Sequence, residues 1–110
     1  MLPRMDPEKM RELLAGIWER HKSEMEERLG VLERTSKTLG ERELSGQERI
    51  EAVLAAHKLA GALGTFGRTQ GSEVARALEH RLEGGGPLQA DLPELIETIA
   101  ALRETVNSRT

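Results

Sequence analysis

Residues 56–67 read AHKLAGALGTFG and place one histidine, His57, on a helical face that carries glycine over the next two turns. Gly61 and Gly64 follow the histidine by four and seven residues. Glycine inside a helix costs about 1 kcal/mol relative to alanine, so two glycines here need a compensating reason. Either a neighbouring helix packs closely against this face, or another protein must reach the imidazole of His57.

The helical period helps to separate these two explanations. Residues three, four and seven apart share a helical face, and the face of the histidine is made mostly of small residues: Val53, His57, Ala60, Gly61 and Gly64. The other side carries the larger apolar groups: Ala52, Ala55, Ala56, Leu59, Ala62, Leu63 and Phe66. We therefore expect the second set to form the core and the histidine face to point outward, with close helix packing as the alternative.

Histidine, apolar and glycine positions recur at fixed helical spacing in this region: His57, Leu59, Gly61, Gly64 and Gly67, then Leu78 and Glu79 in a later helix. The pattern resembles the histidine phosphotransfer (HPt) domain of bacterial multi-step phosphorelays, most closely between residues 55 and 83. The resemblance implies a four-helix bundle whose histidine accepts a phosphoryl group from a receiver-domain aspartate and passes it on. It implies response-regulator receiver domains and a histidine kinase or hybrid kinase as partners. The receiver would supply Mg²⁺, so no cofactor of this chain's own is expected.

The resemblance also assigns roles to single residues. His57 is the expected phosphoacceptor, because neutral imidazole is a good nucleophile near neutral pH and forms a labile P–N bond. Many family members carry a lysine three residues after the histidine, where this chain has Ala60. Lys58 is the nearest cation and is the candidate for stabilising the phosphoryl oxygens. The expected partner-docking surface comprises Val53, Ala60, Gly61, Gly64 and Arg68.

Composition narrows the functional classes. The 110 residues carry a formal net charge of −3, no cysteine and two aromatic side chains, Trp18 and Phe66. These features exclude disulfides and cysteine-ligated metals and argue against nucleic-acid binding, which favours basic, aromatic-bearing surfaces. No apolar run approaches the roughly 20 residues of a membrane span, and the start has no signal-peptide pattern. We expect one monomeric, cytoplasmic domain over residues 1–110, with tails at 1–8 and 107–110.

Apolar residues recur at helical spacing in four segments: residues 10–39, 46–66, 69–83 and 92–106. Ser45 and Glu48 form a capping-box pattern, and Thr69 and Asp91 are the expected caps of the last two segments. The fold class is therefore all-α, an up-down-up-down four-helix bundle. The first segment is longer than the others, so its first turns either overhang the bundle or fold back as a short N-terminal capping helix.

The other two histidines are weaker candidates for a functional residue than His57. His21 lies between Ile17 and Met25 on an apolar stripe, which predicts a half-buried histidine, and His80 lies near a helix end. Neither has a second ligand four residues on, so no metal site is expected.

Two other functions remain open for the chain. It could be a docking or scaffold module that does not transfer, for which Ala60 is the best support, or the dimerisation domain of a histidine kinase, which is usually a two-helix hairpin. No nucleotide-binding pattern is present in the sequence. We therefore expect a transfer intermediate without kinase activity rather than a turnover enzyme.

Overall fold

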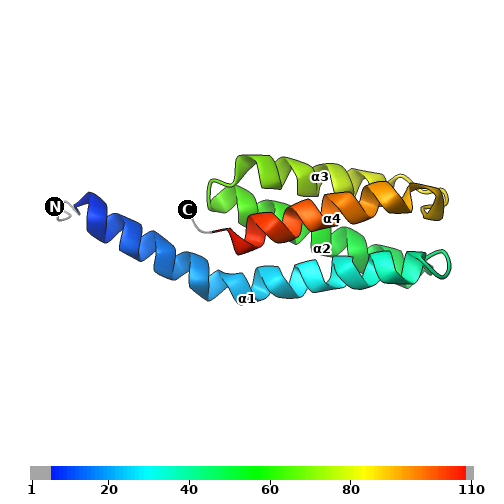
Figure 1. Cartoon of the computed structure of the whole chain (residues 1–110), viewed down its shortest axis with the longest axis horizontal. Helices are drawn as coiled ribbons and strands as arrows, with labels where there is room; N and C mark the ends of the chain where they lie inside the picture. The colour runs from blue at the N-terminus through cyan, green and yellow to red at the C-terminus, as the bar shows by residue number, and fades with distance from the viewer. Residues whose placement is uncertain (1–5, 109–110) are drawn as a thin grey trace.

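The computed structural model describes residues 6–108, and within that range it is built from helices and loops: α1 (Pro7–Leu39), α2 (Gly46–Thr65), α3 (Thr69–Glu83), the short 3-10 helix η1 (Gln89–Asp91) and α4 (Leu92–Asn107). Successive α-helices run in opposite directions, and α1 and α3 each pack against both α2 and α4 (Figure 1). This arrangement confirms the all-α, up-down-up-down four-helix bundle.

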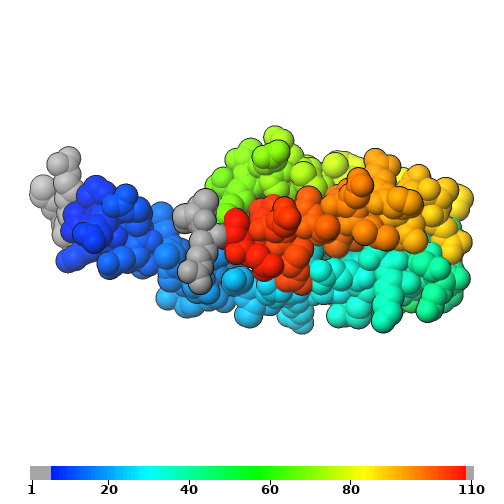
Figure 2. Space-filling view, viewed as in Figure 1, coloured from blue at the N-terminus to red at the C-terminus, as the bar shows by residue number. Residues whose placement is uncertain are grey.

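The first helix is continuous over 33 residues and overhangs the bundle (Figures 1 and 2). The side chain of Asp6 caps it by accepting from the backbone N–H of Lys9 at 2.9 Å. Pro7 and Glu8, which the sequence pattern placed in an N-terminal tail, form its first turn. No separate capping helix folds back within residues 6–108, because neither Gly16 nor Gly30 interrupts α1. The overhang leaves a ridge of half-exposed apolar side chains: Met10, Leu13 and Leu14.

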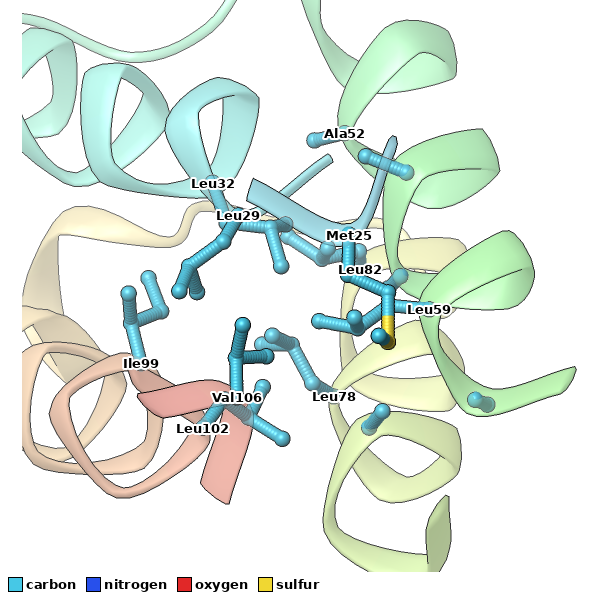
Figure 3. Packing of buried hydrophobic residues seen from close by; sticks show 14 of the residues in the cluster. Met25, Leu29, Leu32, Ala52, Leu59, Leu78, Leu82, Ile99, Leu102 and Val106 are labelled. Carbon is cyan, nitrogen blue, oxygen red and sulfur yellow. The ribbon is translucent and has the colours of Figure 1, made fainter. Parts of the chain in front are cut away.

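The core lies where the four helices face one another, and Figure 3 shows its side chains converging from all of them. Leu29 and Leu32 of α1 meet Leu59 of α2, Leu82 of α3 and Leu102 of α4, and all five are at most 1% exposed. The apolar side of α2 is buried largely as expected from its spacing, but Ala62 and Phe66 are only half-buried. This packing fixes the rotation of α2 and therefore the direction in which His57 points.

The loops at the two ends of the bundle are held by specific hydrogen bonds. Ser45 and Glu48 form the expected capping box at the start of α2. At the same end, Glu43 accepts from the backbone amides of Leu88 and Gln89, and these bonds hold the pKa of Glu43 below its usual range. At the other end, Gly67 has a φ of 75°, the left-handed conformation that lets the chain turn from α2 into α3.

Two expected caps are wrong. Thr69 is the first residue of α3, and the preceding Arg68 makes no side-chain capping bond. Asp91 precedes α4 but does not cap it, because its carboxylate is engaged by the guanidinium of Arg81. Asn107, assigned to a C-terminal tail, is the last residue of α4. The remaining predicted tail positions, 1–5 and 109–110, lie outside the described residues.

Candidate functional site

His57 projects from the middle of α2, and its side chain is 68% exposed. Its Nδ1 lies 3.0 and 3.2 Å from the two carboxylate oxygens of Glu79 on α3. An ionised carboxylate only accepts hydrogen bonds, so Nδ1 carries the proton and donates it. In the neutral ring, Nε2 therefore keeps its lone pair. Glu79 is only 14% exposed, which makes it a fixed acceptor rather than a mobile surface group.

The rotation of α2 assigns its outer residues to different sides of His57. At about 100° per residue, Val53 and Ala60 lie about 40° and 60° to one side, and Lys58 and Gly61 about 100° and 40° to the other. The first side faces α3, since the carbonyl of Ala60 accepts from the hydroxyl of Ser72 at 2.8 Å. The second side faces α1, where Lys58 and Gly61 line a groove together with residues of that helix. The imidazole thus lies on the outer face of α2, with α3 on one side of it and α1 on the other.

Ala60 does not belong to the docking surface. It is 2% exposed and packs against α3, so its assignment to the outward face was wrong. The physical reason is that a residue three positions after His57 lies about 60° around the helix from it, on the side that packs against α3. The other expected docking residues of α2 are accessible, with Val53 half-buried and Gly61 and Gly64 exposed.

The two glycines after His57 differ in what surrounds them. A Cβ built on Gly61 would meet no atom within 4 Å, so no packing in this chain requires glycine there. A Cβ on Gly64 would lie 3.3 Å from the hydroxyl oxygen of Ser72, which is a tight contact with α3. Helix packing therefore accounts in part for Gly64 and does not account for Gly61.

The structure does not bring Arg68 to His57. Its guanidinium lies 4.1 Å from the ring centroid of Trp18 and donates to the hydroxyl of Ser108 at 2.6 Å, at the end of the bundle. His21 was expected to be half-buried, but its side chain is 52% exposed and its ring lies 5.7 Å from that of Phe66. His21 lines an open groove between α1 and α2 instead of the core, so its ring stays at the surface.

Three further residues around His57 were assigned no functional role from the sequence: Glu79, Ile50 and Leu54. Glu79 was part of the family pattern, yet nothing in the sequence showed that its carboxylate would reach the imidazole. Ile50 and Leu54, seven and three residues before His57, are 56% and 49% exposed on the same outer face of α2. Their spacing from the histidine is the signal that could have identified them as part of an apolar docking surface.

Comparison with known proteins agrees with this geometry. The model of the Hpt domain family matches residues 16–106. The chain belongs to the Hpt domain family. This membership gives the chain a phosphotransfer role in a phosphorelay, and the general kind of partner of an Hpt domain is a kinase or receiver domain of a two-component system.

A curated relative of this Hpt domain is Protein RcaC of Microchaete diplosiphon, which is 35% identical over 98 residues. The match covers 88% of this chain and 15% of the relative, so the chain spans about one seventh of that protein's length. No solved structure gives a significant match.

Among residues 6–108 of this Hpt domain, no group of three or more His, Asp or Glu side chains is arranged to hold a metal ion. None of the helices in that range combines the length and apolarity needed to span a membrane.

Proposed function

We propose that His57 accepts a phosphoryl group from the phosphorylated aspartate of a receiver domain and passes it to the aspartate of another. The observation that carries the proposal is the exposed imidazole of His57, whose Nδ1 is held by the largely buried carboxylate of Glu79. An acceptor needs an accessible lone pair in a fixed direction, and this pairing supplies one at Nε2.

In the proposed step, the Nε2 lone pair forms a bond to phosphorus while the P–O bond of the aspartyl phosphate breaks. The bonding electrons leave with the receiver's carboxylate. The imidazole keeps the proton on Nδ1 and becomes cationic, and the negative charge of Glu79 stabilises that ring. Transfer to the next receiver reverses these changes.

The receiver would supply the Mg²⁺ and acidic pocket, because phosphoryl transfer depends on positioning and on charge neutralisation. This chain would supply the nucleophile and an apolar docking surface around it, formed by Ile50, Val53, Leu54, Gly61 and Gly64. Lys58, exposed next to His57, is the proposed cation for the phosphoryl oxygens. Upstream, a histidine kinase or hybrid kinase would provide the phosphoryl group, and the domain would act as a monomer without kinase activity of its own.

A transfer assay tests the proposal. The purified protein is incubated with Mg²⁺ and several receiver domains that carry a radiolabelled phosphoryl group. We expect acid-labile, base-stable label on the wild type and on His80→Gln, a matched control at an exposed histidine, but none on His57→Gln. Label on His57→Gln would contradict the assignment of the acceptor. Absence of label from every variant with all receivers would favour a docking module that does not transfer.

A further inference from the structure

An open groove of about 390 Å³ runs beside His57 between α1 and α2. Met25 and Leu59, both at most 1% exposed, are its most deeply buried lining residues. Its titratable side chains are His57 and Lys58 from α2 and His21, Glu24 and Arg28 from α1. The three α1 residues follow one another by three and four positions, so they share the face that looks onto the groove.

Arg28 lies level with His57 along the helix axes. The two helices are antiparallel, and Trp18 meets Phe66 with ring centroids 5.1 Å apart. From that contact, Arg28 is ten residues along α1 and His57 is nine residues back along α2. At about 1.5 Å per residue, these paths are about 15 and 13.5 Å long, so the two residues stand nearly opposite each other across the groove.

The direction of the imidazole favours the same groove. Its Nδ1 faces Glu79 on α3, which packs against a different face of α2 from α1. The two ring nitrogens point in nearly opposite directions, so Nε2 points away from α3. A phosphoryl group on Nε2 would therefore extend toward solvent on the α1 side, where Arg28 and Lys58 lie.

Two positively charged side chains of the groove, Arg28 and Lys58, are available to bind an anion. Nδ1 of His21 lies 3.7 Å from the carboxylate of Glu24, the acidic residue of the lining. Within residues 6–108, neither Arg28 nor Lys58 has a carboxylate oxygen within 4.0 Å. Arg28 is also half-buried, which reduces the screening of its charge by water.

We infer that Arg28 of α1, together with Lys58 of α2, forms a binding site for the phosphoryl oxygens of phosphorylated His57. The inference rests on the proposed function, in which His57 is the acceptor. Arginine suits this role because its planar guanidinium donates two parallel hydrogen bonds to phosphoryl oxygens. Since the position of the family lysine is the buried Ala60, the neighbouring helix supplies the cation instead. Arg28 is a positioning residue that steadies the acquired group and draws the incoming one toward Nε2.

The small donor phosphoramidate tests this site without a receiver. The Nε2 lone pair of His57 attacks phosphorus, the P–N bond of the donor breaks, and its protonated nitrogen leaves as ammonia. Phosphorus NMR follows the gain of phosphohistidine and its decay. We expect Arg28→Gln to slow the formation of phosphohistidine about five- to tenfold, with the phosphoryl group still on His57. Arg28→Lys should restore most of the rate. Arg34→Gln, an exposed arginine on another face of α1, is the matched control and should behave as the wild type.

A second measurement uses the unaltered protein. Phosphorylation should shift the side-chain Nε–H resonance of Arg28 and leave that of Arg34 in place, an effect that a merely structural arginine would not show. Gain rates within twofold of wild type in Arg28→Gln, or an unmoved Arg28 resonance, would overturn the site while leaving His57 as the acceptor. Wild-type protein that takes no phosphoryl group on His57 would overturn the proposed function and this site together.

Discussion

Small residues lie on both the buried and the exposed side of α2, but for different reasons. On the inner side, Ala52 and Ala56 let neighbouring helices approach closely, and Leu59 and Leu63 fill the space between them; all four are fully buried. On the outer side, Gly61 has no atom near its missing side chain, and His57 is the most prominent reactive group. Small size serves packing on one side and access on the other, so substitutions should separate stability from transfer.

The largest effect should come from the inner side. Leu59→Ala removes a side chain with no exposed surface and leaves a cavity among Leu29, Leu82 and Leu102. We expect a loss of about 2–5 kcal/mol in the free energy of unfolding, measured by urea denaturation. Leu54→Ala on the exposed side of the same helix is the control and should change it by less than about 0.5 kcal/mol. Equal losses at both positions would remove the distinction between the two sides.

Ala60→Lys tests the position that the sequence pattern placed on the wrong side. The longer side chain must enter the packed contact with Ser72, at an expected cost of about 1–3 kcal/mol in stability. Gly61→Lys, one residue later, places its Cβ in open space and should not destabilise the helix. Thermal unfolding of the two variants compares them directly, and a fully stable Ala60→Lys would show that this residue faces outward after all.

Glu79→Gln removes the charge that holds the imidazole without touching α2. The carboxylate becomes an amide, and we expect transfer to His57 to slow by about tenfold, which corresponds to about 1.4 kcal/mol in the barrier. The label should remain on His57, and the melting temperature should stay near that of the wild type. The rate is measured by stopping the transfer from a labelled receiver at successive times. An unchanged rate would mean that the contact between Glu79 and His57 has no role in the reaction.

Gly61→Ala should raise stability by about 0.5–1 kcal/mol, because alanine is the better helix former and the site is open. The same methyl group should slow transfer from a receiver if Gly61 provides clearance for docking. Denaturant unfolding and the transfer assay are both needed for this variant. A gain in stability with an unchanged rate would end the clearance argument, and a loss of stability would point to packing.

The smallest effect lies at the exposed start of α2. Arg42 and the backbone amide of Ser45 lower the pKa of Glu48 to about 2, from a usual value near 4.5. A lowered pKa contributes stability above about pH 4.5 that is lost as the pH falls toward 2. Unfolding curves at pH 5 and pH 3 should therefore differ less for Glu48→Gln than for the wild type. Glu12→Gln in the overhang of α1 is the control and should retain the wild-type difference.

Much of the fold was predictable from the sequence because its signals are local. The order of the helices, the capping box at Ser45 and the turn at Gly67 follow from residues within a few positions of one another. The inner side of α2 was also largely foreseen, since one helical face collected its larger apolar groups. These features need only the period of a single helix.

The neighbours of His57 were less predictable, because they depend on how three helices meet. A single helix does not show that residues leaning to one side of His57 will be covered by α3, so Ala60 was misplaced. The contact with Glu79 joins positions 22 residues apart, and Arg28 stands 29 residues before His57 in the sequence. Only the antiparallel packing of α1, α2 and α3 brings these groups together.

Trp18, held edge-on to Phe66 beneath the guanidinium of Arg68, is the single tryptophan of the chain. The protein therefore carries its own fluorescent reporter at the joint between the overhang and the bundle. Loosening of that joint would hydrate the indole and shift its emission to the red while the circular dichroism of the helices stayed nearly constant. Local opening of α1 and global unfolding thus become two separable optical signals from one unlabelled sample.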